Sequence, residues 1–284
     1  MINTYREKLI LIAVTFLVLL PVDAKSEISI LIDAGHGWGT TGENAKCEDG
    51  AECNYSRPNS DDWPEGKFTL PLSKGISRYI NSYSKKNALN LEAGLTRVNG
   101  SNIGFKKRIN IAHKRGANYI ISIHFNANEC DKIKGCKNKI HGVEAVFDGV
   151  RNENKQIKFC DNLSSAAFKL LNGYEHLKKR KKRDTKKYYS NKHKTNHSSF
   201  FTQIKRKKWK YGLPLSCFLE VEFLDNYYVR EALLKKNVQN MEAELSDNFI
   251  REMSKAVGDY LIAHACYRRV KGERKLKHEC EKKI

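Results

Sequence analysis

Short apolar runs along the chain predict a set of buried strands. The clearest runs are residues 28–34 and 118–124, and further runs occur at residues 142–147 and 214–226. Residues 89–97 give a weaker signal of the same kind. Short, nearly uninterrupted runs that are rich in isoleucine and valine are typical of strands buried on both faces. The pattern therefore predicts four strands and a weaker fifth.

Between these runs, apolar residues recur every three or four positions, which predicts helices. The pattern covers residues 67–83, 102–116 and 153–172, and it returns as a long stripe from Met241 to Leu261. Strands that alternate with helices predict an α/β fold, with a twisted, mostly parallel β-sheet flanked by helices. The length suits one domain of this class or two small ones.

Polar residues that suit metal chemistry lie where the predicted strands end. His36 follows the first run between two glycines, and His124 ends the run at 118–124. Glu220 and Glu222 lie in the last run. Ligands of α/β sheets bind at the carboxyl ends of the strands, and histidine with carboxylate is a common ligand set of catalytic zinc. Either histidine also fits an ordinary buried position, so these residues alone leave both interpretations open.

Two common kinds of site are excluded by their motifs. The chain has no HExxH sequence, so it carries no helix-borne metalloprotease site of that type. No Gly-Lys-Ser or Gly-Lys-Thr follows the glycines around His36, so a phosphate-binding loop is not expected there.

The first 24 residues have the pattern of a secretory signal peptide. Arg6 and Lys8 precede an apolar run, and small residues end the segment at Ala24. The run, about 14 residues long, is short for a membrane span, although a retained membrane anchor is the alternative. We therefore expect the mature protein to be exported from the cytoplasm.

All eight cysteines lie after this segment, as expected in an oxidising compartment. Local disulfides are plausible because the cysteines form three close pairs: Cys47 with Cys53, Cys130 with Cys136, and Cys266 with Cys280. Eight cysteines allow 105 pairings, however, and the sequence does not choose among them. A zinc ribbon is the competing interpretation, but its cysteines usually stand closer together.

Positive charge is concentrated in one segment. Residues 178–210 contain 15 lysines and arginines and one aspartate, which gives +14 of the net charge of +20. In a cytosolic protein such a segment would indicate nucleic acid. For an exported protein we expect no nucleic acid, and the available polyanions are cell-wall polymers and lipid headgroups. A solvated basic loop without a partner is the alternative.

The order of several short motifs resembles the zinc-dependent N-acetylmuramoyl-L-alanine amidases of the type 3 family. The motifs are "DAGHG", "EGKFTL", "LTR", "SIHFNAN", "GVEAVF" and "LEVEFLDN". The first and fourth, in that order, are the most specific. The resemblance implies a single amidase domain, which we place at residues 27–263. Particular to this chain are a basic insertion at about residues 178–210, in a region longer than a minimal family member needs, and a basic tail at 264–284. The resemblance also implies one zinc ion and hydrolysis of the amide between the lactyl group of N-acetylmuramic acid and L-alanine in peptidoglycan.

Matched to the motifs of the family, His36, Glu65 and His124 are the implied zinc ligands. A carboxylate favoured by the helix dipole is the alternative interpretation of Glu65, which opens a predicted helix. The catalytic glutamate of the family lies in the last strand and corresponds to Glu220. Glu222 replaces a glycine of the family, and strand alternation puts it on the same face as Glu220. A second carboxylate there could disturb the site.

Neighbouring residues have predicted supporting roles. Asp33 could orient a ligand imidazole or act as a local structural cap. Arg108 matches an arginine of the family, for which we expect an ion pair or a packing contact rather than catalysis. His113 and His141 match no ligand position of the family.

Three functions fit the sequence. The first is an amidase that acts on peptidoglycan in the periplasm or at the extracellular cell wall. The second is a catalytically inactive, amidase-like module that binds the cell wall or has a regulatory role. The third is a zinc hydrolase that acts on a different amide. Some relatives carry an inserted helix that blocks the active site until a partner removes it. Segment 178–210 is therefore either such a gate, opened by an activator protein, or an anchor for anionic wall polymers.

Overall fold

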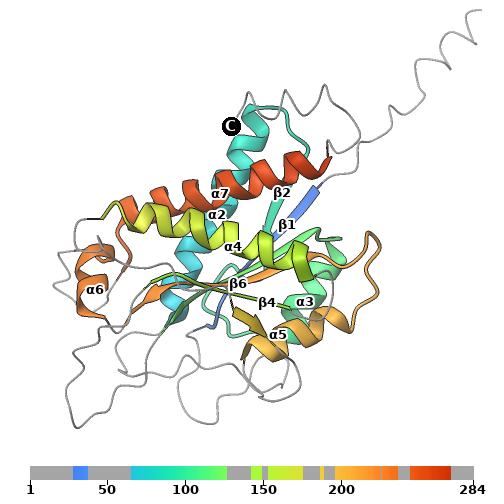
Figure 1. Cartoon of the computed structure of the whole chain (residues 1–284), viewed down its shortest axis with the longest axis horizontal. Helices are drawn as coiled ribbons and strands as arrows, with labels where there is room; N and C mark the ends of the chain where they lie inside the picture. The colour runs from blue at the N-terminus through green and yellow to red at the C-terminus, as the bar shows by residue number, and fades with distance from the viewer. Residues whose placement is uncertain are drawn as a thin grey trace, which may run out of the picture.

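The chain folds around one six-stranded sheet (Figure 1). The computed structural model describes residues 28–37, 65–126, 142–148, 153–174, 186–188, 196–224, 226–235 and 244–269. The strands are β1 (Ile28–Ala34), β2 (Leu91–Leu95), β3 (Tyr119–Asn126), β4 (Glu144–Asp148), β5 (Lys186–Tyr188) and β6 (Leu215–Phe223). All five predicted strands are confirmed, including the weak one. The predicted signal peptide and most of the predicted tail lie outside the described residues.

The sheet is mostly parallel, as predicted. Its strand order is β2-β1-β3-β6-β4-β5. Neighbours from β2 to β6 run parallel, β4 runs antiparallel to β6, and β5 runs parallel to β4. The carboxyl ends of β1, β3 and β6, three adjacent strands, therefore meet at one edge of the sheet. That edge is where an α/β sheet offers its polar groups to a ligand.

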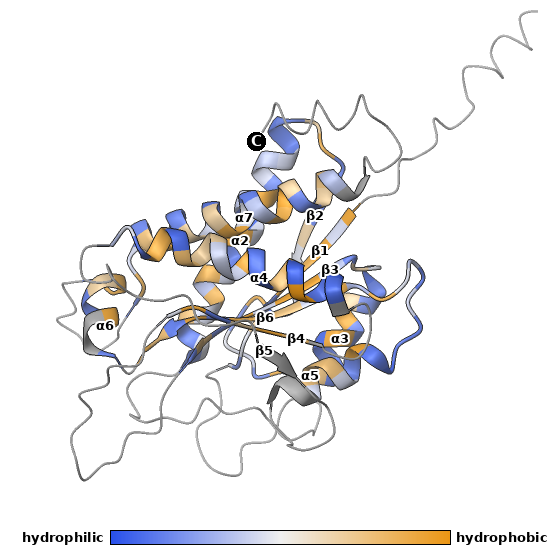
Figure 2. Cartoon of the chain, in the orientation of Figure 1, coloured by the Kyte–Doolittle hydropathy of each residue, from blue (hydrophilic) through white to orange (hydrophobic). Residues whose placement is uncertain are grey.

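Helices cover both faces of the sheet (Figures 1 and 2). They are α2 (Glu65–Lys86), α3 (Phe105–Lys114), α4 (Glu153–Leu171), α5 (Asn196–Lys205), α6 (Tyr227–Leu233) and α7 (Asp247–Arg269). The larger core packs residues of α2, α4 and α7 against one face of the sheet, and the smaller core packs α3 and α5 against the other. No helix within the described part of the chain is long and apolar enough to cross a membrane.

The basic segment 178–210 contains structure that the sequence analysis did not expect. We predicted a loop or a frayed helix, but β5 and α5 both lie within it. Phe200, Phe201 and Ile204 of α5 are almost fully buried in the smaller core. These apolar residues stand one and four positions apart, which is helical spacing, and the surrounding lysines obscured it.

The C-terminal region differs from the prediction in three places. The last strand ends at Phe223, not at residue 226, and the short helix α6 follows. The last helix begins at Asp247 because the hydroxyl of Ser246 accepts a hydrogen bond from the amide of Phe249, as an N-cap does. Leu245 lies before the helix, where it pairs with Leu234. The helix also continues to Arg269 and buries Cys266, so the first residues of the predicted tail belong to the fold.

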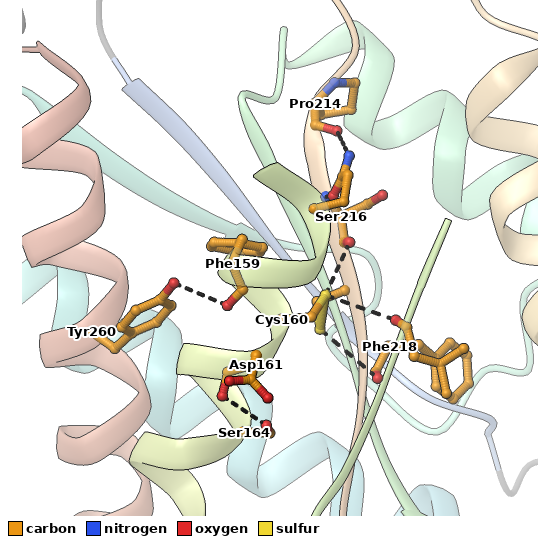
Figure 3. The surroundings of a disulfide bond; sticks show 11 residues. Phe159, Cys160, Asp161, Ser164, Pro214, Ser216, Phe218 and Tyr260 are labelled. Carbon is orange, nitrogen blue, oxygen red and sulfur yellow. Dashed lines mark hydrogen bonds between the residues drawn. A yellow bond between two sulfur atoms is a disulfide. The ribbon is translucent and has the colours of Figure 1, made fainter. Parts of the chain in front are cut away.

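A disulfide joins Cys160 of α4 to Cys217 of β6 (Figure 3). The sequence analysis did not predict this pairing. Of the predicted local pairs, Cys47, Cys53, Cys130, Cys136 and Cys280 all lie outside the described residues. The observed bridge links two elements 57 residues apart in the sequence, through the larger core. A buried cross-link of this kind fits the oxidising compartment that the cysteine count predicts.

Candidate metal centre

Three predicted ligands meet at the carboxyl edge of the sheet. His36 follows β1, Glu65 is the first residue of α2, and His124 lies near the end of β3. One oxygen of Glu65 lies 2.9 Å from Nε2 of His36, and the other lies 2.9 Å from Nδ1 of His124. All three donor atoms lie within 4.8 Å of one another, and they form the one such group found among the described residues.

This donor set fits a zinc ion. Two imidazoles and one carboxylate form a known ligand set of catalytic zinc, which keeps a fourth position for water or substrate. Bonds of about 2.0–2.1 Å in a tetrahedron place the ligand atoms about 3.3 Å apart. The two 2.9 Å contacts involve different oxygens of Glu65, and one ligand atom from each of the three residues lies within 4.8 Å of the other two. Side-chain adjustment would bring these atoms to the tetrahedral separation.

The glycines around His36 allow close packing rather than unusual backbone angles of their own. The positive φ of 50° belongs to His36 itself. A Cβ at Gly35 would lie 2.4 Å from the ring of His124, and one at Gly37 would lie 2.6 Å from the backbone of Asn102. Gly35 therefore lets the turn after β1 pack against the ring of His124, and Gly37 lets it pack against the backbone at Asn102.

Ser122 and Asp33 hold the ring of His124 in place. The Nε2 atom of His124 lies 3.1 Å from the hydroxyl of Ser122, which donates a 2.5 Å hydrogen bond to Asp33. If Nε2 carries the proton, Nδ1 faces Glu65 and is the atom that can bind a metal. The predicted orienting role of Asp33 therefore acts through Ser122, a residue that the sequence analysis missed. The ring also stacks on Phe218, with centroids 3.9 Å apart.

Asp33 is fully buried and ionised in a polar network. Arg108 pairs with it at 2.7 Å, and Thr96 donates a 2.5 Å hydrogen bond to the same oxygen. Burial by itself raises the pKa of Asp33, but Arg108 and the two hydroxyl donors outweigh it and lower the pKa below the ordinary value. The predicted ion-pair role of Arg108 is confirmed. Asp33 thus connects the ligand His124 to the core.

Two arginines fix the backbone that carries His36. Arg97 donates to the carbonyls of Ala34 and Gly35, both at 2.9 Å, and Arg108 donates to the carbonyl of His36 at 2.9 Å. These bonds hold the turn after β1 in the conformation that aims His36 at Glu65. Arg97 belongs to the weak "LTR" motif, which signalled its position but not its role.

Glu65 and His124 are poised as ligands by their surroundings. Burial raises the pKa of Glu65, but His36 and His124 more than compensate and hold it well below the usual carboxyl range. Burial also lowers the pKa of His124, against the opposing effect of Glu65. A neutral imidazole and an ionised carboxylate are the protonation states that bind zinc. Glu65 also accepts a 2.8 Å hydrogen bond from the amide of Phe125, so it links helix α2 to β3.

Glu220 lies beside the cluster, directly opposite His124 in the pairing of β3 with β6. On its other side, the antiparallel pairing of β4 with β6 puts Glu144 opposite Glu220. Directly opposite residues project to the same face, so Glu144, Glu220 and His124 form a row across three strands. Glu220 is 8% exposed and Glu144 is 4% exposed. Glu144 comes from the "GVEAVF" motif, and its closeness to Glu220 was not anticipated.

Glu222 has a structural role. Its side chain is 1% exposed and accepts hydrogen bonds from the amides of Gly142, at 2.7 Å, and Phe223, at 2.9 Å. The pairing of β3 with β6 shifts here, because His124 lies opposite Glu220 but Asn126 lies opposite Phe223. Such a bulge breaks the simple alternation on which we placed both glutamates on one face. Glu222 therefore replaces the glycine of the family by binding backbone amides beside the site.

The remaining histidines stay out of the cluster. His113 lies at the end of α3, where its Nε2 is 3.0 Å from the carbonyl oxygen of Lys208. His141 lies outside the described residues.

Comparison with known proteins agrees with this geometry. The sequence profile of a family described as N-acetylmuramoyl-L-alanine amidase matches residues 30–252. No curated protein sequence matches the chain.

Several solved structures have a similar fold. The catalytic domain of CwlV, an amidase of this kind from Bacillus (Paenibacillus) polymyxa var. colistinus, is 18% identical, with a TM-score of 0.52 over 84% of this chain and 98% of that one. An N-acetylmuramoyl-L-alanine amidase from Clostridium difficile 630 is 14% identical, with a TM-score of 0.54 over 84% and 97%. AmiC2 of Nostoc punctiforme is 16% identical, with a TM-score of 0.52 over 85% and 99%.

At such identities the structural matches establish the fold, and the family assignment rests on the profile. The profile covers well over half of the chain and includes His36, Glu65, His124 and Glu220. The chain therefore belongs to the N-acetylmuramoyl-L-alanine amidase family and is an enzyme of that class.

Proposed function

We propose that this chain is an exported, zinc-dependent amidase that cleaves peptidoglycan between the lactyl group of N-acetylmuramic acid and L-alanine. The observation that carries the proposal is the cluster of His36, Glu65 and His124, with Glu220 opposite His124 on the next strand. This arrangement provides three metal ligands and one carboxylate that is not needed as a ligand. It supports hydrolysis better than simple binding of the wall.

In this mechanism His36, Glu65 and His124 would hold zinc, which would supply Lewis-acid chemistry for the scissile carbonyl and for water. Glu220 accepts a proton from the attacking water and later returns it to the departing alanine nitrogen, as a general base and acid. Ser122 and Asp33 keep the ring of His124 aimed at the cluster. Arg97 and Arg108 keep the His36 backbone fixed.

The test is mass spectrometry of the products from purified peptidoglycan incubated with residues 25–284 and zinc. We expect free stem peptides that begin with L-alanine. Glu220→Gln should lower the rate by a factor on the order of 10²–10⁴, the usual contribution of a general acid–base group. A chelator should abolish activity, and added zinc should restore it.

Other products would decide between the alternatives. Fragments produced by cleavage of a different bond would support the metal site but would change the assignment of the substrate. A protein that binds peptidoglycan and zinc but releases no fragment would support the inactive, wall-binding module.

Export and attachment to the wall belong to the same proposal. The disulfide between Cys160 and Cys217 supports an oxidising compartment, in the periplasm or outside the cell. The charge of segment 178–210 supports an anchor for anionic wall polymers. A gate that an activator protein opens stays a prediction.

The structure changes how anchor and gate can be separated. Deletion of residues 178–210 would remove Phe200 and Phe201 from the core and would unfold part of the domain. Charge-neutralising substitutions at residues 178–183 avoid that damage. An anchor predicts that they weaken activity on intact walls only, whereas a gate predicts higher activity on every substrate.

A further inference from the structure

A basic pocket lies between the end of α3 and the loop that joins α5 to β6. That loop lies on the right in Figure 1. The volume of the pocket is about 860 Å³. Two segments line it, residues 113–117 and residues 208–212. Figure 2 shows the loop as mainly hydrophilic. The pocket is therefore a concave surface separate from the residues of the metal centre.

Specific contacts hold the two walls of the pocket together. His113 at the end of α3 and the carbonyl oxygen of Lys208 are joined by a 3.0 Å hydrogen bond. The ring of His113 also meets that of Trp209 edge to face, with centroids 5.3 Å apart. Trp209 in turn donates a 2.9 Å hydrogen bond to the carbonyl of Ile204, in α5. The loop is thus fastened to the core, and the pocket is a built feature of the fold.

Positive charge dominates the lining. Lys114, Arg115, Lys208 and Lys210 contribute to it, and none of the lining residues is acidic. Arg115 is partly neutralised by Glu92, at 2.9 Å on the surface. The ammonium group of Lys210 lies 5.1 Å from the centre of the Tyr211 ring. A cationic group therefore stands next to the ring of Tyr211, and Trp209 adds a second aromatic ring to the same lining.

The pocket lies at the opposite end of the sheet from the metal centre. Residue 117 lies just before β3, which begins at Tyr119. His124 lies five residues beyond Tyr119 in that strand, about 17 Å at 3.3 Å per residue. Residue 212 likewise precedes β6, and Glu220 lies near its other end. A ligand in the pocket would not block the metal centre, so both can be occupied together.

We propose that this pocket binds a phosphate-bearing polysaccharide or polyol polymer of the wall. Lysine ammonium groups bind phosphate as compact point charges, and amphipathic aromatic rings pack against the apolar face of a sugar or polyol unit. A concave site admits a polymer chain more readily than it admits a broad membrane surface. The proposal rests on the proposed function in one respect: the protein must be exported to the wall, where it would encounter such a polymer.

The test compares two charge-reversed variants of the full mature chain. Lys208→Glu/Lys210→Glu alters the pocket, and Lys155→Glu/Lys158→Glu makes the same charge change at two exposed positions of α4. Titration calorimetry with poly(glycerol phosphate) measures binding. We expect the pocket variant to bind the polymer about tenfold more weakly or worse, because it loses direct contacts with phosphate. The α4 variant carries the same change in net charge but loses no such contact, so it should bind within about twofold of the parent. Tyr211→Ala should also weaken binding.

Two results would overturn the proposal. Equal losses in both charge variants would mean that net charge, not the pocket, attracts the polymer. Anionic phospholipid vesicles that bind as tightly as the polymer, and compete with it, would identify a membrane surface instead.

Hydrolysis of a soluble muropeptide, measured in parallel, should be unchanged in both charge variants. A parent protein that binds the polymer but does not hydrolyse the muropeptide would contradict the amidase mechanism without contradicting the proposal for the pocket.

Discussion

At the residue scale, Glu220 and Glu222 of β6 have different roles. Glu222 binds two backbone amides, so Glu222→Gln, which keeps a side-chain oxygen acceptor, should retain activity within a few-fold of the parent. Glu222→Ala leaves both buried amides without that acceptor and should lower the free energy of unfolding by about 1–3 kcal/mol per unsatisfied group. Urea unfolding and the muropeptide assay measure the two effects. Large loss of activity in Glu222→Gln with unchanged stability would contradict the structural role and place Glu222 in the chemistry.

The same residues show how far the sequence predicts the site. Motif order, a set of local patterns, pointed to His36, Glu65 and His124, which the structure brings together. It also pointed to Glu220, whose catalytic role stays a prediction. Ser122 could not be found in this way, because its role depends on the distance between two strands. Simple alternation is not a reliable guide at Glu222, since the bulge beside it is a property of two paired strands and leaves no mark in the sequence of either one.

At the element scale, the disulfide ties α4 to the strand that carries Glu220. Closing a loop of this length stabilises a fold by about 4 kcal/mol in the chain-entropy account. Cys160→Val/Cys217→Val fills most of the space of the two sulfurs and should lower the melting temperature by about 8–16 °C. Cys160→Ala/Cys217→Ala should melt lower still, because it adds a cavity. Calorimetry measures both melting temperatures. A valine variant with the same melting temperature as the parent would show that the cross-link does not contribute to stability.

Most elements were predictable because their apolar residues repeat at the period of a strand or a helix. The exceptions have identifiable causes. Helix α5 is only ten residues long, and lysines surround the three apolar residues that bury it. The pairing of Cys160 with Cys217 joins an element before the basic segment to one after it, so spacing along the chain carried no information.

At the scale of the whole molecule, the metal centre joins parts of the fold that are distant in sequence. Its three candidate ligands come from the end of β1, the start of α2 and the end of β3. An ion bound by all three would hold these elements together only in the folded state. By linkage, zinc at 100 times its dissociation constant should stabilise the fold by about 2.7 kcal/mol. For a domain of this size that corresponds to a rise in melting temperature of about 5–11 °C.

Thermal unfolding with and without zinc measures this link independently of catalysis. His124→Ala removes one ligand and should abolish most of the rise, whereas His113→Ala removes a histidine outside the cluster and should leave it intact. Glu220→Gln should also keep the rise, because Glu220 is not among the three ligands, even though it should lose activity. A rise that persists in His124→Ala would place the bound zinc elsewhere in the chain. A rise that disappears in Glu220→Gln would make Glu220 a ligand and not the catalytic base.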